Sequence, residues 1–370
     1  MTTTATDRPP EGGRSKDAEA RRRVDFGHAS LAVRVGPIGL RWQVRSLVVC
    51  TIIVLLTLGL AVWAVTLGDY PLTIGQVISA FFGDPDSDFA RIVVVEWRLP
   101  RVLAAIVFGA ALGIAGAVFQ SMTRNPLASP DIIGFTTGSY TGALVVIILL
   151  SGGYLQVAAG ALVGGVCTAL AVYVLAWRNG VQGFRLIIVG IAISAVLGSL
   201  NTWLMLSADL EVAISATVWG AGSLAGITWE QASIGSVVIA VLLLLLTALT
   251  PGLRQLELGD DAAKATGVRA ESLRLAVMVL GVALTATVTA AAGPISFVAL
   301  AAPQIARRIT RTPGVTLVPA AVTGALLLLF ADIVAQHLYY VSLPVGVVTV
   351  VVGGAYLVWL IIHEVRRRSV

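Results

Sequence analysis

Long apolar runs, separated by short connections that are polar or contain Gly and Pro, make up most of the chain from residue 47 onward. A helix needs about 20 mainly apolar residues to cross a bilayer, and most runs are close to that length. The pattern predicts an all-α polytopic membrane protein with about ten transmembrane helices. The predicted spans are residues 47–66, 101–121, 132–152, 154–177, 185–206, 229–250, 272–292, 294–309, 315–335 and 343–363. Gly293 and Pro294 leave open whether the seventh and eighth spans are separate or form one re-entrant element.

Polar segments flank the apolar region at both ends. Residues 1–45 contain three consecutive arginines at 21–23 and lack an apolar core followed by a small-residue cleavage site. They therefore predict a flexible cytoplasmic tail, and not a signal peptide. Residues 46–364 form the predicted transmembrane domain, and residues 365–370 form a short basic cytoplasmic C-terminus.

The basic residues predict the orientation in the membrane. With ten spans and an N-terminus inside, 22 of the 25 Lys and Arg residues fall in the tail, the inside connections or the C-terminus. Lys and Arg collect in cytoplasmic loops, so both termini are expected in the cytoplasm. The exceptions, Arg91, Arg98 and Arg101, lie together in the outside segment before the second span.

Composition excludes several classes of function. A content of 57% hydrophobic and 12% charged residues excludes a soluble fold. The net charge of +5 follows from the cytoplasmic loops, so nucleic acid is not an expected partner. The chain has neither a G-x-x-x-x-G-K-[ST] phosphate loop nor an H-E-x-x-H pattern, and its three histidines are scattered. We therefore expect no catalytic residue and no metal site.

Charged residues are scarce within the predicted spans. The candidates are Asp332, late in the ninth span, and Glu230, at the edge of the sixth. An ion-coupled carrier usually places several carboxylates or broken helices near the midplane, so this scarcity disfavours that class. Asp332 is expected to have a local structural partner.

The sizes of the residues within the spans indicate which helix faces pack against other helices and which face lipid. Gly109, Gly113, Gly160 and Gly164 follow small-xxx-small spacings, which predict close helix packing. The run Leu242–Leu246 offers nothing small or polar and is predicted to face lipid.

Two motifs at the ends of spans point to function. RLPR, Arg98–Arg101, places two arginines at the outer face, and Pro100 suits the start of the second span. The alternative is that these arginines reach toward lipid headgroups.

NPLASP, Asn125–Pro130, breaks the helix at the inner face directly after Arg124. An ordinary turn is the alternative.

The inside connection after the sixth span contains a short predicted helix between Gly259 and Gly267. Asp260 and Asp261 belong to its first turn and Lys264 to its last, as the helix dipole favours. Gly259 is expected to end an extended entry from the sixth span, and Gly267 to stop the helix. One face is predicted to be nearly bare because it carries the small residues Ala262, Ala263 and Ala265.

Six stretches together resemble the FecCD-type permeases of ABC importers for iron siderophores, haem and cobalamin. They occur in the family's order and cover nearly the whole membrane part. The stretches are RLPRVLAAIVFGAALGIAGAVFQSMTRNPLASPDIIGFTTGSYTGA, FRLIIVGIAISAVL, VWGAGSL, LGDDAAKATGV, GPISFVALAAPQIARRI and LPVGVVTVVVGGAYLVWLI.

The resemblance implies the partners and the cargo. Such a chain is a multi-pass permease of the bacterial cytoplasmic (inner) membrane, surrounded by lipid, and it forms a pore with a second permease, identical or related. Two cytoplasmic ATPase subunits bind ATP and Mg, so no cofactor is expected on this chain. An external substrate-binding protein delivers a ferric siderophore. Cobalamin or haem remain alternative cargoes, and an ion-coupled secondary carrier acting alone is the rival class.

The resemblance also implies roles for the motifs. The RLPR arginines pair with acidic residues of the binding protein, the NPLA loop forms an inner gate together with residues 179–182, and the segment 259–267 is the coupling helix that enters a cleft of the ATPase. The candidate residues are Arg98 and Arg101 for docking, Asn125, Pro126 and Leu127 for the gate, and Gly259, Asp260, Asp261, Ala262, Lys264 and Gly267 for the coupling helix.

Two ranges and two single positions also bear on this resemblance. Leu186–Leu206 and Val345–Leu360 match the helices that line the transport path, and both are mostly apolar. Gln304 stands where the family often has a histidine, and no role is evident for it. Gln336 stands where many members have an arginine, which removes a possible third docking contact.

Overall fold

The computed structural model describes residues 30–35, 38–82, 88–131, 133–177, 183–312, 314–338 and 342–368, and the chain divides into two compact units. The first unit, Met1–Val48, contains a hairpin of two antiparallel strands, β1 (Ser30–Val35) and β2 (Ile38–Gln43). Residues 1–29 of the predicted tail lie outside the described residues.

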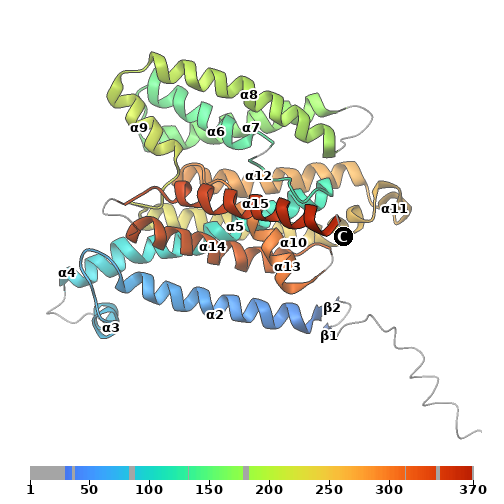
Figure 1. Ribbon diagram of the computed structural model, residues 1–370, viewed down its shortest axis with the longest axis horizontal. Helices are drawn as coiled ribbons and strands as arrows, with labels where there is room; N and C mark the ends of the chain where they lie inside the picture. The colour runs from blue at the N-terminus through green and yellow to red at the C-terminus, as the bar shows by residue number, and fades with distance from the viewer. Residues whose placement is uncertain are drawn as a thin grey trace, which may run out of the picture. The chain divides into compact units, whose positions relative to one another are not determined.

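The second unit, Val49–Val370, is helical in its described part (Figure 1). Its helices are α2 (Val44–Thr66, which begins in the first unit), α3 (Ile74–Phe82), α4 (Asp88–Arg91), η2 (Ile92–Arg98), α5 (Leu99–Thr123), α6 (Phe135–Leu144), η3 (Val145–Leu149), α7 (Tyr154–Ala176), α8 (Gly183–Ser207), α9 (Leu210–Gly220), α10 (Trp229–Glu257), α11 (Asp260–Ala265), α12 (Ala270–Ala292), α13 (Val298–Thr310), α14 (Leu317–His337) and α15 (Val345–Arg368). The segments η2 and η3 are π-helical.

Each predicted span corresponds to a helix, so the all-α membrane fold is confirmed. Within the described residues, seven helices are long and apolar enough to cross a membrane, and residues 135–149 and 345–359 form shorter apolar helices. The eighth span is α13, which has only 13 residues and follows a non-helical break at 293–297. At about 1.5 Å per residue it is shorter than the hydrocarbon core. The seventh and eighth spans are therefore separate helices, and the second is short.

The central helix of this unit is α5, which packs against α10, α12, α13 and α14. Glycines make these approaches possible, as predicted. A side chain at Gly109 or Gly113 would collide with the backbone of α14, and one at Gly116 would collide with the carbonyl of Ala299 on α13. The backbones of α5, α13 and α14 therefore lie close together between Gly109 and Gly116.

A second group of helices comprises α6, α7, α8 and α9 (Figure 1). Gly160 and Gly164 of α7 lie against Gly142 and Gly138 of α6, which confirms the packing role predicted for them. The long α8 packs against both of these helices. The helix α9 was not predicted as an element.

Two helix boundaries differ from prediction. The second span does not start at Pro100, because α4 and η2 run without interruption into α5 from Asp88. The backbone N–H of Leu99, the residue after η2, donates to the carbonyl oxygen of Val94, five residues earlier. A π-helical turn suits this position because the next residue, Pro100, has no N–H to donate. Similarly, α10 continues to Glu257, so the entry to α11 is helical and not extended.

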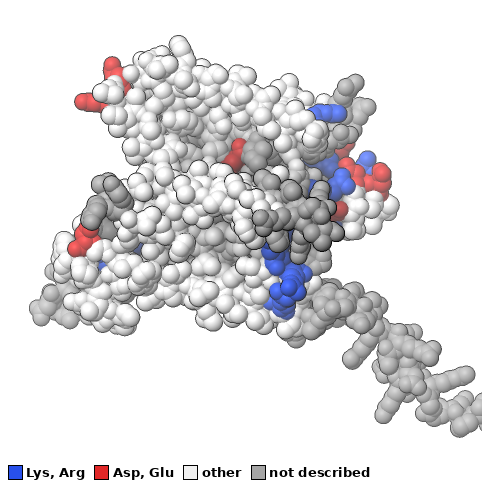
Figure 2. Space-filling view, viewed as in Figure 1, with Lys and Arg blue, Asp and Glu red and all other residues white. Residues whose placement is uncertain are grey.

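Charged side chains gather at the two ends of the helices of this unit, and the surface between them is nearly uncharged on the face that Figure 2 shows. We call the end with α3, α4 and α9 the outer end, and the end with α11 the inner end, following the orientation predicted from the basic residues. This uncharged band is the surface that lipid tails require.

Candidate functional site

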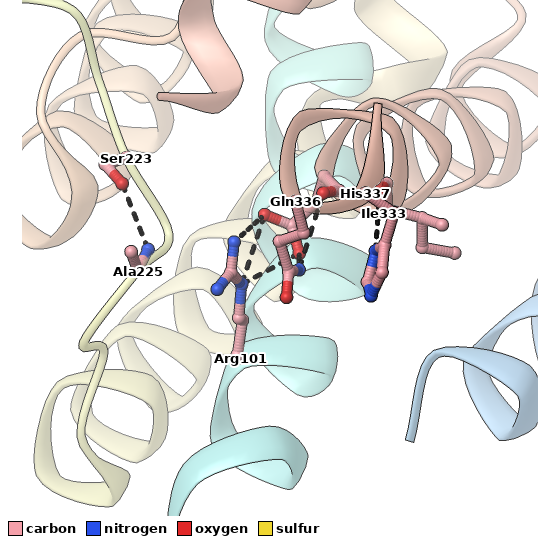
Figure 3. Close-up of polar contacts among 7 residues, drawn as sticks. Arg101, Ser223, Ala225, Ile333, Gln336 and His337 are labelled. Atoms are coloured by element: carbon pink, nitrogen blue, oxygen red, sulfur yellow. Dashed lines mark hydrogen bonds and ion pairs between the residues drawn. The ribbon is translucent and has the colours of Figure 1, made fainter. Parts of the chain in front are cut away.

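At the outer end, Arg101 of α5 forms a two-pronged ion pair with Asp332 of α14. The Nη2 of Arg101 donates to Oδ1 at 2.9 Å, and its Nε donates to Oδ2 at 2.9 Å. Gln336 donates to the same Oδ2 at 2.7 Å, and Figure 3 shows Arg101 and Gln336 converging beside α14. The side chain of Asp332 is 2% exposed and that of Arg101 is 18% exposed. The expectation of a structural partner for Asp332 is confirmed.

Arg98 also has partners within the fold. It donates to the carbonyl oxygen of Val65 at 2.8 Å and to that of Tyr70 at 2.7 Å. Val65 lies in the last turn of α2, where carbonyls lack helical donors. Gly68, at φ +138°, leaves room for the guanidinium, since a Cβ there would lie 2.7 Å from Nη2. Both acceptors are neutral, and the charge of Asp69 acts on Arg98 without a contact ion pair, whereas Arg101 is in direct contact with the carboxylate of Asp332.

At the inner end, the NPLA motif forms a loop, which we call the gate loop (residues 124–134). The helix α5 ends at Thr123, and Arg124 takes a left-handed conformation with φ +53°. The side chain of Asn125 accepts a hydrogen bond from the N–H of Leu127 at 2.9 Å, which closes an Asx turn. Leu127 is 45% exposed, so its side chain points away from the packed core. The predicted helix break is confirmed, and residues 179–182 lie outside the described part of the chain.

Sequence reasoning overlooked Asp131, which ties the far end of the gate loop to the break before α13. One carboxylate oxygen accepts from the Thr136 hydroxyl at 2.6 Å, and the other accepts from the backbone N–H of Phe297 at 3.4 Å. Phe297 has a left-handed conformation with φ +70°, which is uncommon for an aromatic residue and needs such support. The signal that could have revealed Asp131 is a carboxylate followed at once by an apolar run.

The predicted helix at the inner end is present as α11. Gly259, at φ +112°, precedes it and Gly267, at φ +84°, follows it, and both conformations favour glycine. Ala262 is exposed, but Ala263 is buried in the core, so the expectation that both lie on one free face was wrong. Successive residues of a helix point about 100° apart, which places neighbours on different faces.

Asp260 links α11 to two other elements. Its Oδ1 lies 2.7 Å from Nη2 of Arg274 in α12 and 3.8 Å from Nη2 of Arg124 in the gate loop. Asp260 and Asp261 lie in the first turn of α11 and Lys264 lies in its last turn, as predicted. A cavity of about 700 Å³ lies beside this group and is also lined by Phe184 and Asp261. Figure 2 shows both signs of charge at this end of the molecule.

The helices expected to line the path, α8 and α15, carry many exposed large apolar side chains. In α8 these include Ile188, Ile191, Val196 and Trp203, and in α15 they include Val351. An apolar face of this extent needs lipid or another subunit to cover it. Among the described residues, no group of three His, Cys, Asp or Glu side chains is placed to hold a metal ion.

Residues 52–363 match the FecCD transport family. The chain is 49% identical over 325 residues to the ferric enterobactin transport system permease protein FepG of Escherichia coli, covering 88% of this chain and 98% of FepG. It is 38% identical over 274 residues to the Fe(3+) dicitrate transport system permease protein FecD of Escherichia coli, covering 73% of this chain and 85% of FecD.

Solved structures with a similar fold include an ABC transporter of the metal-chelate type in an inward-facing conformation. That chain superposes with a TM-score of 0.76 at 29% identity, and the match covers 85% of this chain and 99% of the other. The match covers most of both chains, so this chain shares the fold of that transporter.

Proposed function

Because the chain belongs to the FecCD transport family of ABC transporter permeases, we propose that it is the membrane-spanning subunit of an importer that carries a ferric siderophore. The observation that carries this proposal is the 49% identity to the ferric enterobactin permease, which extends over 98% of that protein. A family permease is not itself an enzyme, and its energy comes from ATP bound with Mg by separate ATPase subunits. The other partners of the proposed importer are a second permease and an external binding protein.

Transport by the reconstituted complex tests this function. The permease, its partner permease and the ATPases are placed in liposomes, with the cognate binding protein outside. Uptake of ⁵⁵Fe-labelled ferric enterobactin, ferric dicitrate and a ferric hydroxamate is compared with uptake of cobalamin and haem. We expect one ferric siderophore to enter only with ATP and Mg. Import of haem or cobalamin, but of no ferric siderophore, would overturn the proposed cargo. Uptake without nucleotide would favour a secondary carrier over an ABC importer.

For docking of the binding protein we propose Arg98 and Arg101, with Arg98 as the stronger contributor. Both lie at the outer end within one turn of each other, where acidic groups on a binding protein could reach them. The charge of Arg101 is largely neutralised by Asp332, whereas Arg98 bonds to neutral carbonyls. A charge that the fold does not neutralise steers association most effectively.

For the inner gate we propose Asn125, Pro126 and Leu127. The Asx turn of Asn125 fixes the loop, and Pro126 prevents the helix from continuing. Leu127 then presents an exposed apolar side chain, which suits a plug that closes an apolar path. The matching loop of the second permease would complete the closure.

For coupling to the ATPase we propose α11 with its flanking glycines. Ala262 and Lys264 are exposed on it, so a partner groove could receive this turn closely. Asp260 connects the same turn to Arg124 at the start of the gate loop and to Arg274 in α12. Movement of α11 is thereby passed to both the gate and a transmembrane helix.

The protein is a multi-pass inner-membrane protein, and we propose that both termini are cytoplasmic. This orientation places α11 and the gate loop on the ATPase side, and it agrees with the distribution of basic residues. Residues 46–364 then form the transport domain, with the N-terminal segment and residues 365–370 outside the membrane.

A further inference from the structure

Two buried glutamine side chains lie against the gate loop. Gln304 of α13 is 9% exposed, and Gln120, near the end of α5, is 1% exposed. The Nε2 of Gln304 donates to Oε1 of Gln120 at 2.7 Å and to the backbone carbonyl of Pro126 at 3.0 Å. The Nε2 of Gln120 in turn donates to the carbonyl of Leu300 at 3.1 Å. The amide of Gln304 therefore joins α5, α13 and the gate loop at one point.

The chemistry of this point suits an amide. A side-chain amide nitrogen carries two N–H donors, and each has an acceptor here. A histidine nitrogen carries at most one hydrogen, so a histidine at position 304 could not serve both acceptors from one atom. Within the local turn, the side chain of Asn125 accepts from the N–H of Leu127, and its carbonyl accepts from the N–H of Ala128. Neither bond involves the carbonyl of Pro126, which accepts from Gln304.

The gate loop is held to α13 at both of its ends. Pro126 is bonded to Gln304, and Asp131 accepts from the N–H of Phe297 immediately before α13. The helix α13 is itself fixed to α5, where Gly116 lies directly against the carbonyl of Ala299. The loop is therefore joined through α13 to α5, the central helix of the unit.

We propose that Gln304, oriented by Gln120, is a positioning residue that clamps the gate loop to α13 and keeps the inner gate closed at rest. The proposal rests on the gate function proposed above for Asn125, Pro126 and Leu127. Gln304 touches no cargo in this role. Its effect is on the population of open gates, because the loop must lose the Pro126 hydrogen bond when it moves away from α13.

Three variants separate this clamp from a general packing role. Gln304→Met keeps the side-chain length but removes both donors. Gln120→Met removes the supporting acceptor but leaves Gln304 free to bond Pro126. The double variant Gln304→Met/Gln120→Met leaves neither side chain with an unpaired polar atom, which often restores stability. The carbonyl of Pro126 still lacks a hydrogen-bond donor in this variant. Each is reconstituted as the complete transporter, without nucleotide, and leak of entrapped carboxyfluorescein is measured beside thermal stability in detergent.

We expect Gln304→Met and the double variant to leak about five-fold faster than wild type, the change in open population for one lost hydrogen bond of about 1 kcal/mol. Gln120→Met should leak within about two-fold of wild type, although it is less stable. Gln304→His keeps one possible N–H donor per ring nitrogen at this position and should leak at an intermediate rate.

Two outcomes would overturn the clamp: wild-type leak in Gln304→Met or Gln304→His, or leak that simply follows thermal stability across the set. The dye is not the cargo, so the leak pattern is independent of what the importer carries. If the wild-type complex imports no ferric siderophore but the leak pattern appears, the proposed cargo fails and the clamp stands.

Discussion

Replacing Arg101 alone should destabilise the permease far more than replacing Arg101 and Asp332 together. The carboxylate of Asp332 is 2% exposed, and three contacts of 2.9–3.2 Å from Arg101 supply most of its hydrogen bonds. Arg101→Leu leaves this charge buried with only Gln336 beside it. Breaking a buried ion pair in this way costs about 3–5 kcal/mol, or about 10²- to 4 × 10³-fold in the unfolding equilibrium.

The double variant Arg101→Leu/Asp332→Leu removes both charges. Replacing a buried pair by apolar side chains of similar volume is often neutral, so we expect a stability within about 1 kcal/mol of wild type. Arg91→Leu is the matched control, because Arg91 is an exposed arginine of α4 at the same end, and its loss should cost no more than about 0.5 kcal/mol.

The measurement is equilibrium unfolding of purified protein in mixed micelles, titrated with SDS and followed by circular dichroism. Arg101→Leu should unfold at clearly lower SDS fraction than the double variant and the Arg91 control. A loss below about 1 kcal/mol in Arg101→Leu, or a double variant as unstable as the sum of the two single changes, would refute the assignment of a compensated buried pair.

The same double variant also distinguishes the contribution of Arg101 to stability from its contribution to docking of the binding protein. It is expected to be stable but to lack the Arg101 charge, so its association with the cognate binding protein can be measured on nanodisc-embedded permease. Weakened association would support a docking contribution from Arg101. Unchanged association would leave Arg98 as the docking residue at this end.

Three further changes test the other proposed roles. Arg98→Gln should weaken association of the binding protein and reduce its salt dependence, whereas Arg98→Lys should retain both; equal affinity of the two variants would contradict docking. Leu127→Ala should raise leak through the nucleotide-free transporter, and a leak at the wild-type level would make the loop an ordinary turn. Ala262→Trp should weaken binding of the ATPases or allow them to hydrolyse ATP without import. Asp260→Asn should reduce import per ATP hydrolysed, whereas Asp261→Asn, in the same turn, should not. Normal import and hydrolysis in both Ala262→Trp and Asp260→Asn would show that coupling does not pass through α11.

The positions of the spans were predictable because a bilayer requires long apolar runs, and the sequence records that requirement directly. The ends of the helices were less so. The helix α10 continues to Glu257 and the second span begins at α4, in both cases through residues with more polar side chains. Outside the hydrocarbon core, apolar content no longer marks where a helix stops.

Which face a residue occupies was also beyond the sequence. The run Leu242–Leu246 was expected to face lipid, yet Leu246 is 1% exposed and packs in the core. Five consecutive residues cover more than one full turn of a helix, so one of them must point inward on any packed helix. The same geometry buries Ala263 beside the exposed Ala262.

Pairs that join distant segments were the least predictable part of the candidate site. Arg101 and Asp332 were both identified, but they are 231 residues apart, and periodicity contains no information on such a contact. Gln120 and Gln304 are 184 residues apart and were not connected. The sequence identified chemically unusual residues, and only the fold could show which of them meet.

A glutamine at position 336 suits this pairing. Asp332 offers one negative charge, and Arg101 already occupies both of its oxygens. The amide of Gln336 donates to Oδ2 at 2.7 Å without a second positive charge, so the cluster stays close to neutral in a buried setting. An arginine at 336 would bring two cations to one carboxylate and would have to direct its charge outward, where a binding protein could meet it. In this chain that outward charge is left to Arg98, which is why we expect Arg98 to dominate docking.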